Sequence, residues 1–304
     1  MSHFVSWHFA STATGQRIKT IMMIVTDTAS DLLEDEAAEL GVKLAPLDIA
    51  FGDIHCTRNI PEKFDEFYRL LETSEEFPKT SQPSPDTYLG FIREAQENDE
   101  EVLILCMTSD ISGTYESARM TANLSGYDRI AVIDTRQAIV SQGIVVRYAV
   151  KLRDEGKTLA EMVPLIEEFS SRVHVCGIMG TLTYLRKGGR IPASLAVIGN
   201  LLKIKPTIAV ENGELVSPAK AKGTAAAKKI IWKQFAEADI DPEWPVYFPY
   251  TSDRELAEKL REETVERFGL DIENTCFQQV GGTIGAHLGP GAFGFAYVEK
   301  KHED

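Results

Sequence analysis

The feature that most constrains the fold is a repeated order of apolar strand, turn and helix along the first half of the chain. Runs of the buried-strand type stand at residues 21–27 (IMMIVTD), 102–107 (VLILCM) and 130–135 (IAVIDT), and a helical pattern follows each run. Neighbouring strands joined through helices pair in parallel, and both faces of such a sheet are covered. We therefore predict an α/β fold whose N-terminal sheet is mainly parallel, with helices on both faces.

Capping signals predict where several helices begin. Ser84 precedes Pro85, which suits an N-cap followed by the first helical turn. Thr158 and Glu161 have the spacing of a capping box. These pairs predict helices that start near residues 85 and 159.

Two further segments of the first half receive specific predictions. The sequence VKLAPLDIAF (42–51) is expected to form one strand. Thr80 and Ser81 precede the helix capped by Ser84, and we expect them to lie in a loop.

After about residue 172 the pattern changes. VHVCGIM (173–179) predicts a strand, ASLAVIGNLL (193–202) an apolar helix, and Asn212-Gly213 the turn of a β-hairpin. Helices are expected at 224–238 and 253–268, and strands near 246–250, 275–280 and 293–299. This pattern favours an α+β arrangement for the second half.

The resulting organisation has an extension and two domains. Residues 1–20 lack the continuous apolar centre of a signal peptide and are interpreted as an N-terminal extension. An N-terminal α/β domain is predicted over residues 21–165 and a C-terminal α+β domain over residues 166–304.

Composition narrows the function classes. The net charge of −14 argues against general nucleic-acid binding, and no apolar run approaches the roughly 20 residues that span a bilayer. The four cysteines are widely spaced without a metal-binding pattern, which fits a reducing cytoplasm. Between residues 186 and 233, however, ten Lys or Arg accompany only two Glu, which is typical of a solvated surface or of a docking surface for an anionic partner.

Common catalytic and nucleotide motifs are missing or misplaced. GPGAFG (289–294) satisfies the spacing GxGxxG, but a strand is expected to follow it, whereas a dinucleotide fingerprint opens a helix. There is no GxxxxGK[ST] loop, no HExxH pair and no histidine cluster. The sequence therefore gives little support to a nucleotide-binding kinase or a zinc enzyme.

Several small polar residues are candidates for holding an anion. Ser112 and Gly113 stand where a strand turns into a helix, and free backbone N–H groups at such a turn favour negative charge. His287 lies among the glycines of GTIGAHLGPGAFGFAY and can donate a hydrogen bond to a carboxylate or phosphate. Helix capping and local backbone contacts also explain Ser112, Thr80 and Ser81, and a structural role also explains His287.

Taken together, these segments resemble the DegV family, bacterial fatty-acid-binding proteins that serve as the binding subunit of fatty acid kinase. The match covers nearly all of residues 22–297 and keeps the family order. Its motifs are IVTDTASDL, KTSQPSPDTY, ISGTYESA, VIDTRQAIVSQG, LTYLRKGGRI, LLKIKPTI and IGAHLGPGAFG.

The resemblance implies a long-chain fatty acid held between two domains, with its tail in an apolar tunnel and its carboxylate near the surface. The carboxylate site that it implies comprises Thr80, Ser81, Ser112, Gly113 and His287. The glycines around His287 are expected to let the backbone pass close to the lipid head group. ASLAVIGNLL and GAFGF are expected to line the tunnel, with no metal and no cofactor beside the fatty acid.

The resemblance also implies a protein partner. In the family, a separate ATP-dependent kinase subunit phosphorylates the presented carboxylate, so the chain itself is expected to be a cytoplasmic carrier of fatty acid and acyl phosphate, and not an enzyme. Arg190 matches a family arginine that helps to engage the kinase. Lys222 stands where a second arginine is expected, which keeps the charge but loses the planar fork. Membrane contact is expected to be transient at most.

Two other functions remain open from the sequence. A serine esterase or thioesterase would use Ser112 as nucleophile, His287 as base and Asp27 or Asp134 as the orienting acid, although no GxSxG elbow is present. A nucleic-acid-binding regulator would use the basic segment, against the acidic charge of the whole chain.

Overall fold

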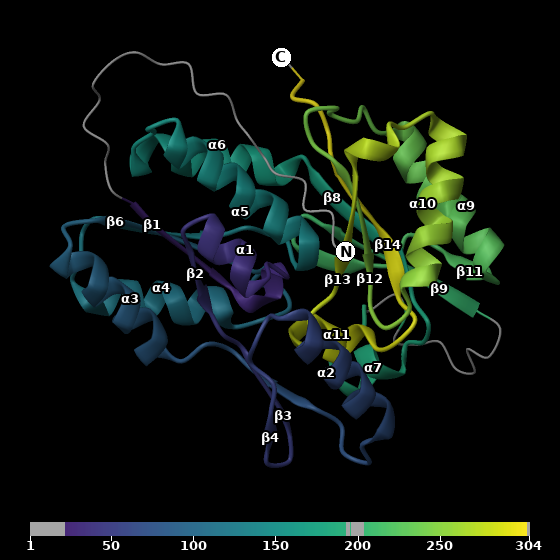
Figure 1. Ribbon diagram of the computed structural model, residues 1–304, viewed down its shortest axis with the longest axis horizontal. Helices are drawn as coiled ribbons and strands as arrows, with labels where there is room; N and C mark the ends of the chain where they lie inside the picture. The colour runs from purple at the N-terminus through teal and green to yellow at the C-terminus, as the bar shows by residue number, and fades with distance from the viewer. Residues whose placement is uncertain (1–21, 193–194, 196–203, 303–304) are drawn as a thin grey trace.

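The first half of the chain forms the predicted parallel sheet, with helices on both of its faces (Figure 1). The structure is a computed structural model and describes residues 22–192, 195 and 204–302. The predicted extension and almost all of the predicted apolar helix (193–202) therefore lie outside the described residues. In sheet order, the strands are β2 (Val42–Ala45), β1 (Met22–Asp27), β6 (Glu101–Cys106) and β7 (Ile130–Asp134).

The alternation of side chains along β1 supplies a core to each face of this sheet. Met23 and Val25 pack toward α3 (Pro85–Glu97) and α4 (Thr114–Ser125). Met22 and Ile24 point to the opposite face, which is covered by α1 (Glu34–Glu39), α5 (Ile139–Asp154) and α6 (Leu159–Ser171). These four side chains of β1 are all buried, as the apolar run predicts.

Both capping predictions are confirmed. The Ser84 hydroxyl accepts a hydrogen bond from Thr87 N at the start of α3, whose first residue is Pro85. At the start of α6, Thr158 and Glu161 form both hydrogen bonds of a capping box. These contacts join residues a few positions apart, so the local sequence suffices to specify them.

The helix α5 lies between two sheets and is buried on nearly every side. One apolar cluster joins α5 and α6 to β1 and β6 and also to the second sheet, through residues such as Val175 and Ala296. This position explains why IVSQGIVVRYAV carries apolar residues all around the helix, and not along a single stripe.

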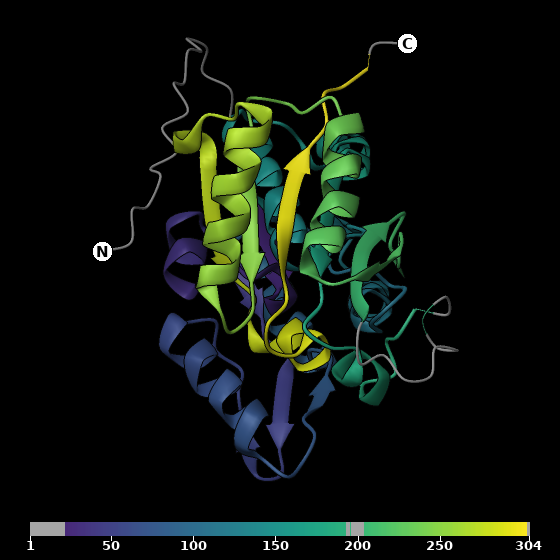
Figure 2. The same ribbon diagram turned by 90° about the vertical axis from the view of Figure 1, so that its right-hand side faces the viewer.

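The second half forms a seven-stranded, largely antiparallel sheet, in agreement with the predicted α+β pattern. Its order is β10 (Glu214–Val216), β9 (Ile204–Glu211), β8 (Val173–Ile178), β14 (Phe293–Val298), β12 (Val246–Tyr250) and β13 (Thr275–Gln279), and β11 (Lys220–Lys222) pairs with β9. The helices α9 (Thr224–Glu237) and α10 (Arg254–Phe268) cover one face, as Figure 2 shows, and α5 packs on the other. The predicted turn at Asn212-Gly213 joins β9 to β10, with positive φ at both residues.

A small third sheet and α2 (Pro61–Thr73) form one end of the molecule (Figure 2). In this sheet β3 (Asp48–Phe51) lies between β4 (Ile54–His55) and β5 (Lys79–Ser81). Aromatic side chains of α2 and β3 pack against α11 (Gly282–Leu288). The remaining short elements are α7 (Thr183–Lys187), η1 (Thr28–Ser30) and η2 (Ile272–Asn274).

Two sequence predictions for this region are wrong. Residues 42–51 do not form one strand, because Pro46 has no N–H for a ladder and the chain divides into β2 and β3, which belong to different sheets. Thr80 and Ser81 lie in β5 and not in a loop. Thr80 pairs with Ile49, a partner far away in the chain that local signals do not reveal.

The predicted domain boundary at residues 165–166 stays a prediction. It falls within α6, which ends at Ser171, and β8 begins at Val173. The core cluster around α5 includes residues from both sides of this point. In the described part of the chain, every helix is too short or too polar to cross a lipid bilayer.

Candidate functional site

A cavity lies between the parallel sheet and the second sheet, and both halves of the chain contribute to its wall. Its volume is about 930 Å³, including the space at its open mouth. Met107 follows β6 and Ala138 follows the end of β7, so the cavity stands at the carboxyl ends of the parallel strands, where α/β sheets commonly bind ligands. Ile178 of β8, Ile208 of β9 and Ile284 of α11 form part of the opposite wall.

The cavity opens into a second, outer groove, and the residues that line both define the mouth of the cavity. This outer groove has a volume of about 970 Å³, open solvent included, and shares Ile111, Ser112, Arg190 and Leu215 with the cavity. Arg190 is exposed, whereas Ile111 and Ser112 are half-buried, as expected where a cavity meets solvent.

Thr80 and His287 meet in the wall of the cavity although they are far apart in the sequence. Thr80 Oγ1 lies 3.1 Å from His287 Nε2, within hydrogen-bond distance, and both residues line the cavity. Thr80 comes from β5 and His287 from the last turn of α11. The packing of α11 against α2 and β3 therefore brings the two side chains together.

Ser112 reaches the same mouth from the start of α4. Its hydroxyl lies 2.8 Å from Thr114 Oγ1 and accepts a hydrogen bond from Thr114 N at 3.3 Å. The N-cap position itself belongs to Gly113. Ser112 thus makes the ordinary local contact of a helix start and also lines the cavity.

Arg190 joins two of the segments around the mouth. Its Nε donates to Ile111 O at 3.1 Å, and its Nη1 donates to Gly188 O at 2.7 Å. Gly188 in turn lies close against the His287 ring: a Cβ added to Gly188 would overlap His287 Nδ1. The segments that carry Ser112, Arg190 and His287 are therefore held together by direct contacts.

His287 is neutral at pH 7 in this setting. Burial, together with the nearby positive charge of Arg190, lowers the pKa of the imidazole to about 4. Its Nδ1 is buried and has no hydrogen-bond partner among the described residues. The ring therefore has one N–H donor and one acceptor nitrogen, and not two donors.

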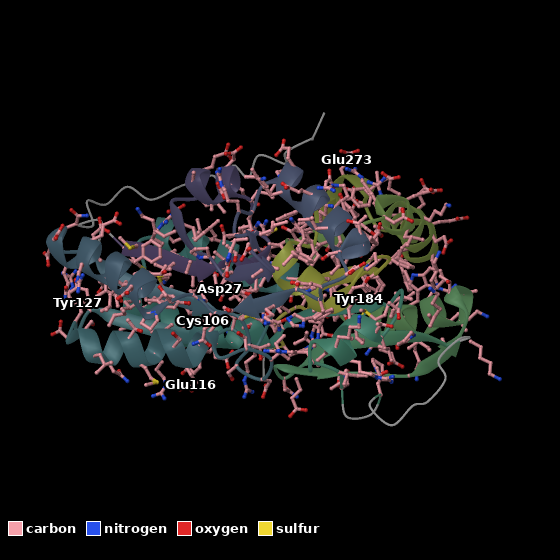
Figure 3. All side chains as sticks on the ribbon, turned by 90° about the horizontal axis from the view of Figure 1, so that it is seen from below. Asp27, Cys106, Glu116, Tyr127, Tyr184 and Glu273 are labelled. Carbon is pink, nitrogen blue, oxygen red and sulfur yellow. The ribbon has the colours of Figure 1, made fainter. Side chains whose placement is uncertain are left out.

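The geometry of a serine hydrolase is not formed by these residues. Ser112 bonds within its own turn and His287 bonds to Thr80, so no hydrogen bond joins nucleophile to base. Asp27 lies in the middle of the molecule (Figure 3), where its carboxylate accepts from the backbone N–H groups of Ala29 and Met107. Burial raises the pKa of Asp27 to about 6, and no hydrogen bond joins its side chain to His287.

The second acid considered for a hydrolase is also engaged elsewhere. Asp134 accepts hydrogen bonds from the backbone N–H groups of Arg136 and Ser109, at the end of β7. The structure therefore provides no orienting acid for His287 in the described part of the chain.

The expected role of the glycines around His287 is wrong for three of them. A Cβ on Gly282 would clash with Ile49 and Phe67, one on Gly285 with Tyr68, and one on Gly289 with the ring of Tyr184. These glycines let α11 approach aromatic side chains. The helix itself was not predicted from the sequence. Its glycine-rich sequence is a poor helix former, so tertiary packing decides the local structure here.

Of the other predicted site residues, Arg190 lines the cavity and Gly113, Ser81 and Lys222 do not. Gly113 lines the outer groove but not the cavity, and Ser81 is exposed and lines neither. Lys222 is exposed on β11 and also lines neither. Arg190, expected to dock the kinase or to contact a phosphate, also lines the cavity.

Sequence reasoning missed most of the apolar wall. Met107 and Ala138 could have been found, because each closely follows a predicted parallel strand, at the sheet edge where ligands bind. Of the expected tunnel segments, GAFGF contributes Ala292, Phe293 and Gly294 to the wall, and ASLAVIGNLL lies outside the described residues except for Leu195. In residues 22–192, 195 and 204–302, no group of three His, Cys, Asp or Glu is arranged to hold a metal ion.

Comparison with known proteins extends these observations. The sequence profile of the DegV family of uncharacterised proteins matches residues 22–300. A DegV domain-containing protein from Caldanaerobacter subterraneus is 31% identical over 278 residues, which cover 91% of this chain and 98% of that protein.

Two solved structures are similar over nearly their whole length. The structure of a DegV family protein from Thermus thermophilus, described as fatty-acid binding, has a TM-score of 0.82 at 31% identity and covers 92% of this chain and 100% of the other. A fatty-acid-binding DegV family protein from Streptococcus agalactiae has a TM-score of 0.83 at 27% identity, with coverages of 92% and 99%.

Proposed function

The chain belongs to the DegV family, and on that premise we propose that it binds a long-chain fatty acid in the cavity between its two sheets. One observation carries the proposal: an apolar cavity has Thr80, Ser112, Arg190 and His287 in its wall and adjoins the outer groove at Ser112 and Arg190. This is the arrangement that an amphipathic ligand with one anionic end requires. The fatty-acid-binding relatives from Thermus thermophilus and Streptococcus agalactiae support it.

The apolar wall supplies the affinity in this proposal. A sixteen-carbon acid carries roughly fourteen methylenes, and burial at about 0.8 kcal/mol each gives on the order of 11 kcal/mol before the entropic costs of binding. Hydrogen bonds to the charged carboxylate contribute about 1.5–3 kcal/mol each. The polar mouth therefore mainly determines which end of the ligand faces solvent.

The carboxylate is held by hydroxyl groups, and His287 sets the direction of one of them. A carboxylate only accepts hydrogen bonds, so Thr80 and Ser112 must each donate to it. When His287 Nε2–H donates to Thr80 Oγ1 across the 3.1 Å contact, the hydroxyl hydrogen of Thr80 is free for the ligand. The low pKa of His287 keeps the ring in the neutral form that this arrangement uses.

Lipid extraction and native mass spectrometry of the purified protein test the binding proposal directly. We expect a retained fatty acid. We expect Ser112→Ala to weaken fatty-acid affinity by about tenfold, the cost of a lost charge-assisted hydrogen bond, and His287→Ala to weaken it by a similar factor, because Thr80 then loses the partner that directs its hydroxyl hydrogen to the carboxylate. The matched control is His55→Ala, because His55 is an exposed histidine that pairs with Asp48 and lines neither hollow. Unchanged affinity in both site variants contradicts the assignment of the carboxylate site.

We further propose that the chain is a cytoplasmic carrier for an ATP-dependent fatty acid kinase subunit. The carboxylate at the mouth attacks the γ-phosphorus of ATP held by that subunit, and acyl phosphate and ADP form. No catalytic residue, metal or cofactor is assigned to the carrier itself. Contact with a membrane is transient and contact with nucleic acid is not part of the function.

Arg190 and Lys222 are the proposed kinase-docking residues. Both are exposed, and Arg190 lies at the mouth, where it can reach a phosphoryl group or an acidic partner surface. The double variant Arg190→Glu/Lys222→Glu is expected to lower turnover of the reconstituted kinase at least tenfold. The same charge change at Lys259 and Lys301, exposed lysines outside both hollows, serves as the control. Normal turnover by the first double variant would end the docking proposal.

A further inference from the structure

The contact between Gln82 and Gly113 lies beside the carboxylate site but belongs to no role assigned so far. Gln82 directly follows β5, and Gly113 is the N-cap of α4. A Cβ placed on Gly113 would overlap Gln82 Oε1, so the carboxamide rests on the glycine where any other residue would have a side chain. No hydrogen bond accompanies the contact among those found for the described residues, which makes it a packing contact.

This contact joins the two segments that supply the hydroxyl groups. Thr80 is two residues before Gln82, and Ser112 is next to Gly113. The strand β5 belongs to the small sheet with β3 and β4, whereas α4 packs on the parallel sheet. The two hydroxyls therefore belong to different layers of the molecule. Contacts between these layers must set the distance from one hydroxyl to the other.

Gln82 also completes a closed series of contacts around the mouth. Ile111, two residues before Gly113, accepts from Arg190, which also donates to Gly188 O; Gly188 lies against His287, and His287 contacts Thr80. Without Gln82 on Gly113, this series ends at Thr80 and does not return to α4. The contact of Gln82 with Gly113 is thus the direct link between the end of β5 and the start of α4, beside the longer route through Arg190 and His287.

We propose that Gln82 is a positioning residue, which by resting on Gly113 holds Thr80 and Ser112 at the separation that one carboxylate needs. The inference rests on the proposed fatty-acid function and adds residues to it. On this proposal, position 113 needs glycine because a side chain there would take the space of Gln82. Backbone conformation is not the reason, since the φ of −76° suits any residue.

Measured affinities for a sixteen-carbon fatty acid and for the alcohol of the same length test this inference. Gln82→Ala removes the contact, and Gly113→Ala displaces the flexible end of Gln82. We expect each single variant to lose about threefold to tenfold in affinity for the acid and to bind the alcohol within about twofold of the wild type, because the tail site is intact. A general loss of structure would weaken both ligands equally.

The double variant separates the contact from an effect on the helix cap. If Gly113 acts only by accommodating Gln82, Gln82→Ala/Gly113→Ala binds the acid no more weakly than either single variant. Gln82→Met, which keeps the length of the side chain, is expected to retain acid affinity within about twofold. Gly90→Ala, in open space on the exposed side of α3, is the matched glycine control.

Three outcomes in the alanine variants overturn the inference while the proposed function stands: wild-type acid affinity in Gly113→Ala, additive losses in the double variant, or an equal loss for acid and alcohol. A loss in Gln82→Met as large as in Gln82→Ala also overturns it, because packing is then not the cause. Failure of the wild-type chain to bind either ligand is a different result, which contradicts the proposed function itself.

Discussion

At the scale of single residues, the buried carboxyl of Asp31 connects the first sheet to the segment that carries His287. Its Oδ1 accepts a hydrogen bond from Gly281 N at 2.9 Å, and its Oδ2 is buried without a partner in the described part of the chain. Burial, with a smaller contribution from the negative charge of Asp27, raises the pKa of Asp31 well above its ordinary value. The neutral acid is therefore favoured in the folded protein.

This raised pKa makes stability depend on pH in a defined direction. Between the ordinary pKa near 3.8 and the raised folded-state pKa, the folded protein keeps a proton that the unfolded chain has lost, so the free energy of unfolding falls as pH rises. Asp31→Asn removes this dependence and keeps the acceptor for Gly281. Asparagine also tolerates the φ of 57° at this position.

Urea denaturation from pH 4 to pH 8 measures the effect. We expect Asp31→Asn to gain stability relative to the wild type as pH rises, while Asp31→Ala, which loses the hydrogen bond to Gly281, is less stable than Asp31→Asn at every pH. A stability difference between wild type and Asp31→Asn that does not change with pH contradicts the raised pKa.

At the scale of elements, α11 is held in place by close packing on its glycines. A Cβ on Gly285 would lie 3.0 Å from Tyr68 Cζ and 3.1 Å from Phe67 Cε1, both on α2. Tyr68 cannot move freely, because its hydroxyl donates to Val280 O at 2.7 Å. A side chain added at Gly285 therefore displaces the helix and with it His287.

Gly285→Ala tests this packing against a matched glycine. Alanine gains about 1 kcal/mol in helix propensity, but overpacking costs about 1–3 kcal/mol, so we expect a net loss of about 1 kcal/mol. Gly90→Ala, with nothing within 4 Å of the new Cβ, is expected to gain about 0.5–1 kcal/mol. Chemical denaturation of both variants provides the comparison, and an equally stabilised Gly285→Ala would mean that α11 is not closely packed there.

The sequence predicted those elements whose signals are local. The cap at Ser84, the capping box at Thr158 and the turn at Asn212-Gly213 each depend on neighbouring residues, and all three are present. The strand β5 and the helix α11 were missed because each is stabilised by partners far away in the chain. For β5 that partner is β3, and for α11 it is the aromatic surface of α2.

The candidate site, too, could be predicted from the sequence only in part. Thr80, Ser112 and His287 were selected from motifs, and the structure brings all three to the wall of one cavity. The hydrogen bond of Arg190 to Ile111 O could not be predicted, because it joins two segments that are far apart in the chain. Local sequence likewise gives no sign that Gln82 rests on Gly113.

At the scale of the whole molecule, a ligand in the cavity contacts both sheets and so stabilises their association. Binding that is restricted to the folded state adds about 2.7 kcal/mol at a ligand concentration of 100 times Kd. For a chain of this length, this corresponds to a rise in Tm of roughly 4 °C. Calorimetry with and without a sixteen-carbon fatty acid measures this shift in Tm. We expect Ser112→Ala to show a smaller shift at the same ligand concentration. If the wild type shows no shift, the fatty acid does not bind between the sheets.

The place of β14 in the second sheet has a consequence for biosynthesis. It is the last strand in chain order, yet it lies between β8 and β12 in the interior of the sheet. A chain still on the ribosome cannot complete this sheet, or the cavity wall that Phe293 and Gly294 provide, until residues 293–298 have been made and released from the exit tunnel. Until then, apolar side chains of β8 and of its neighbours in the core, which β14 covers in the folded protein, stay exposed to solvent.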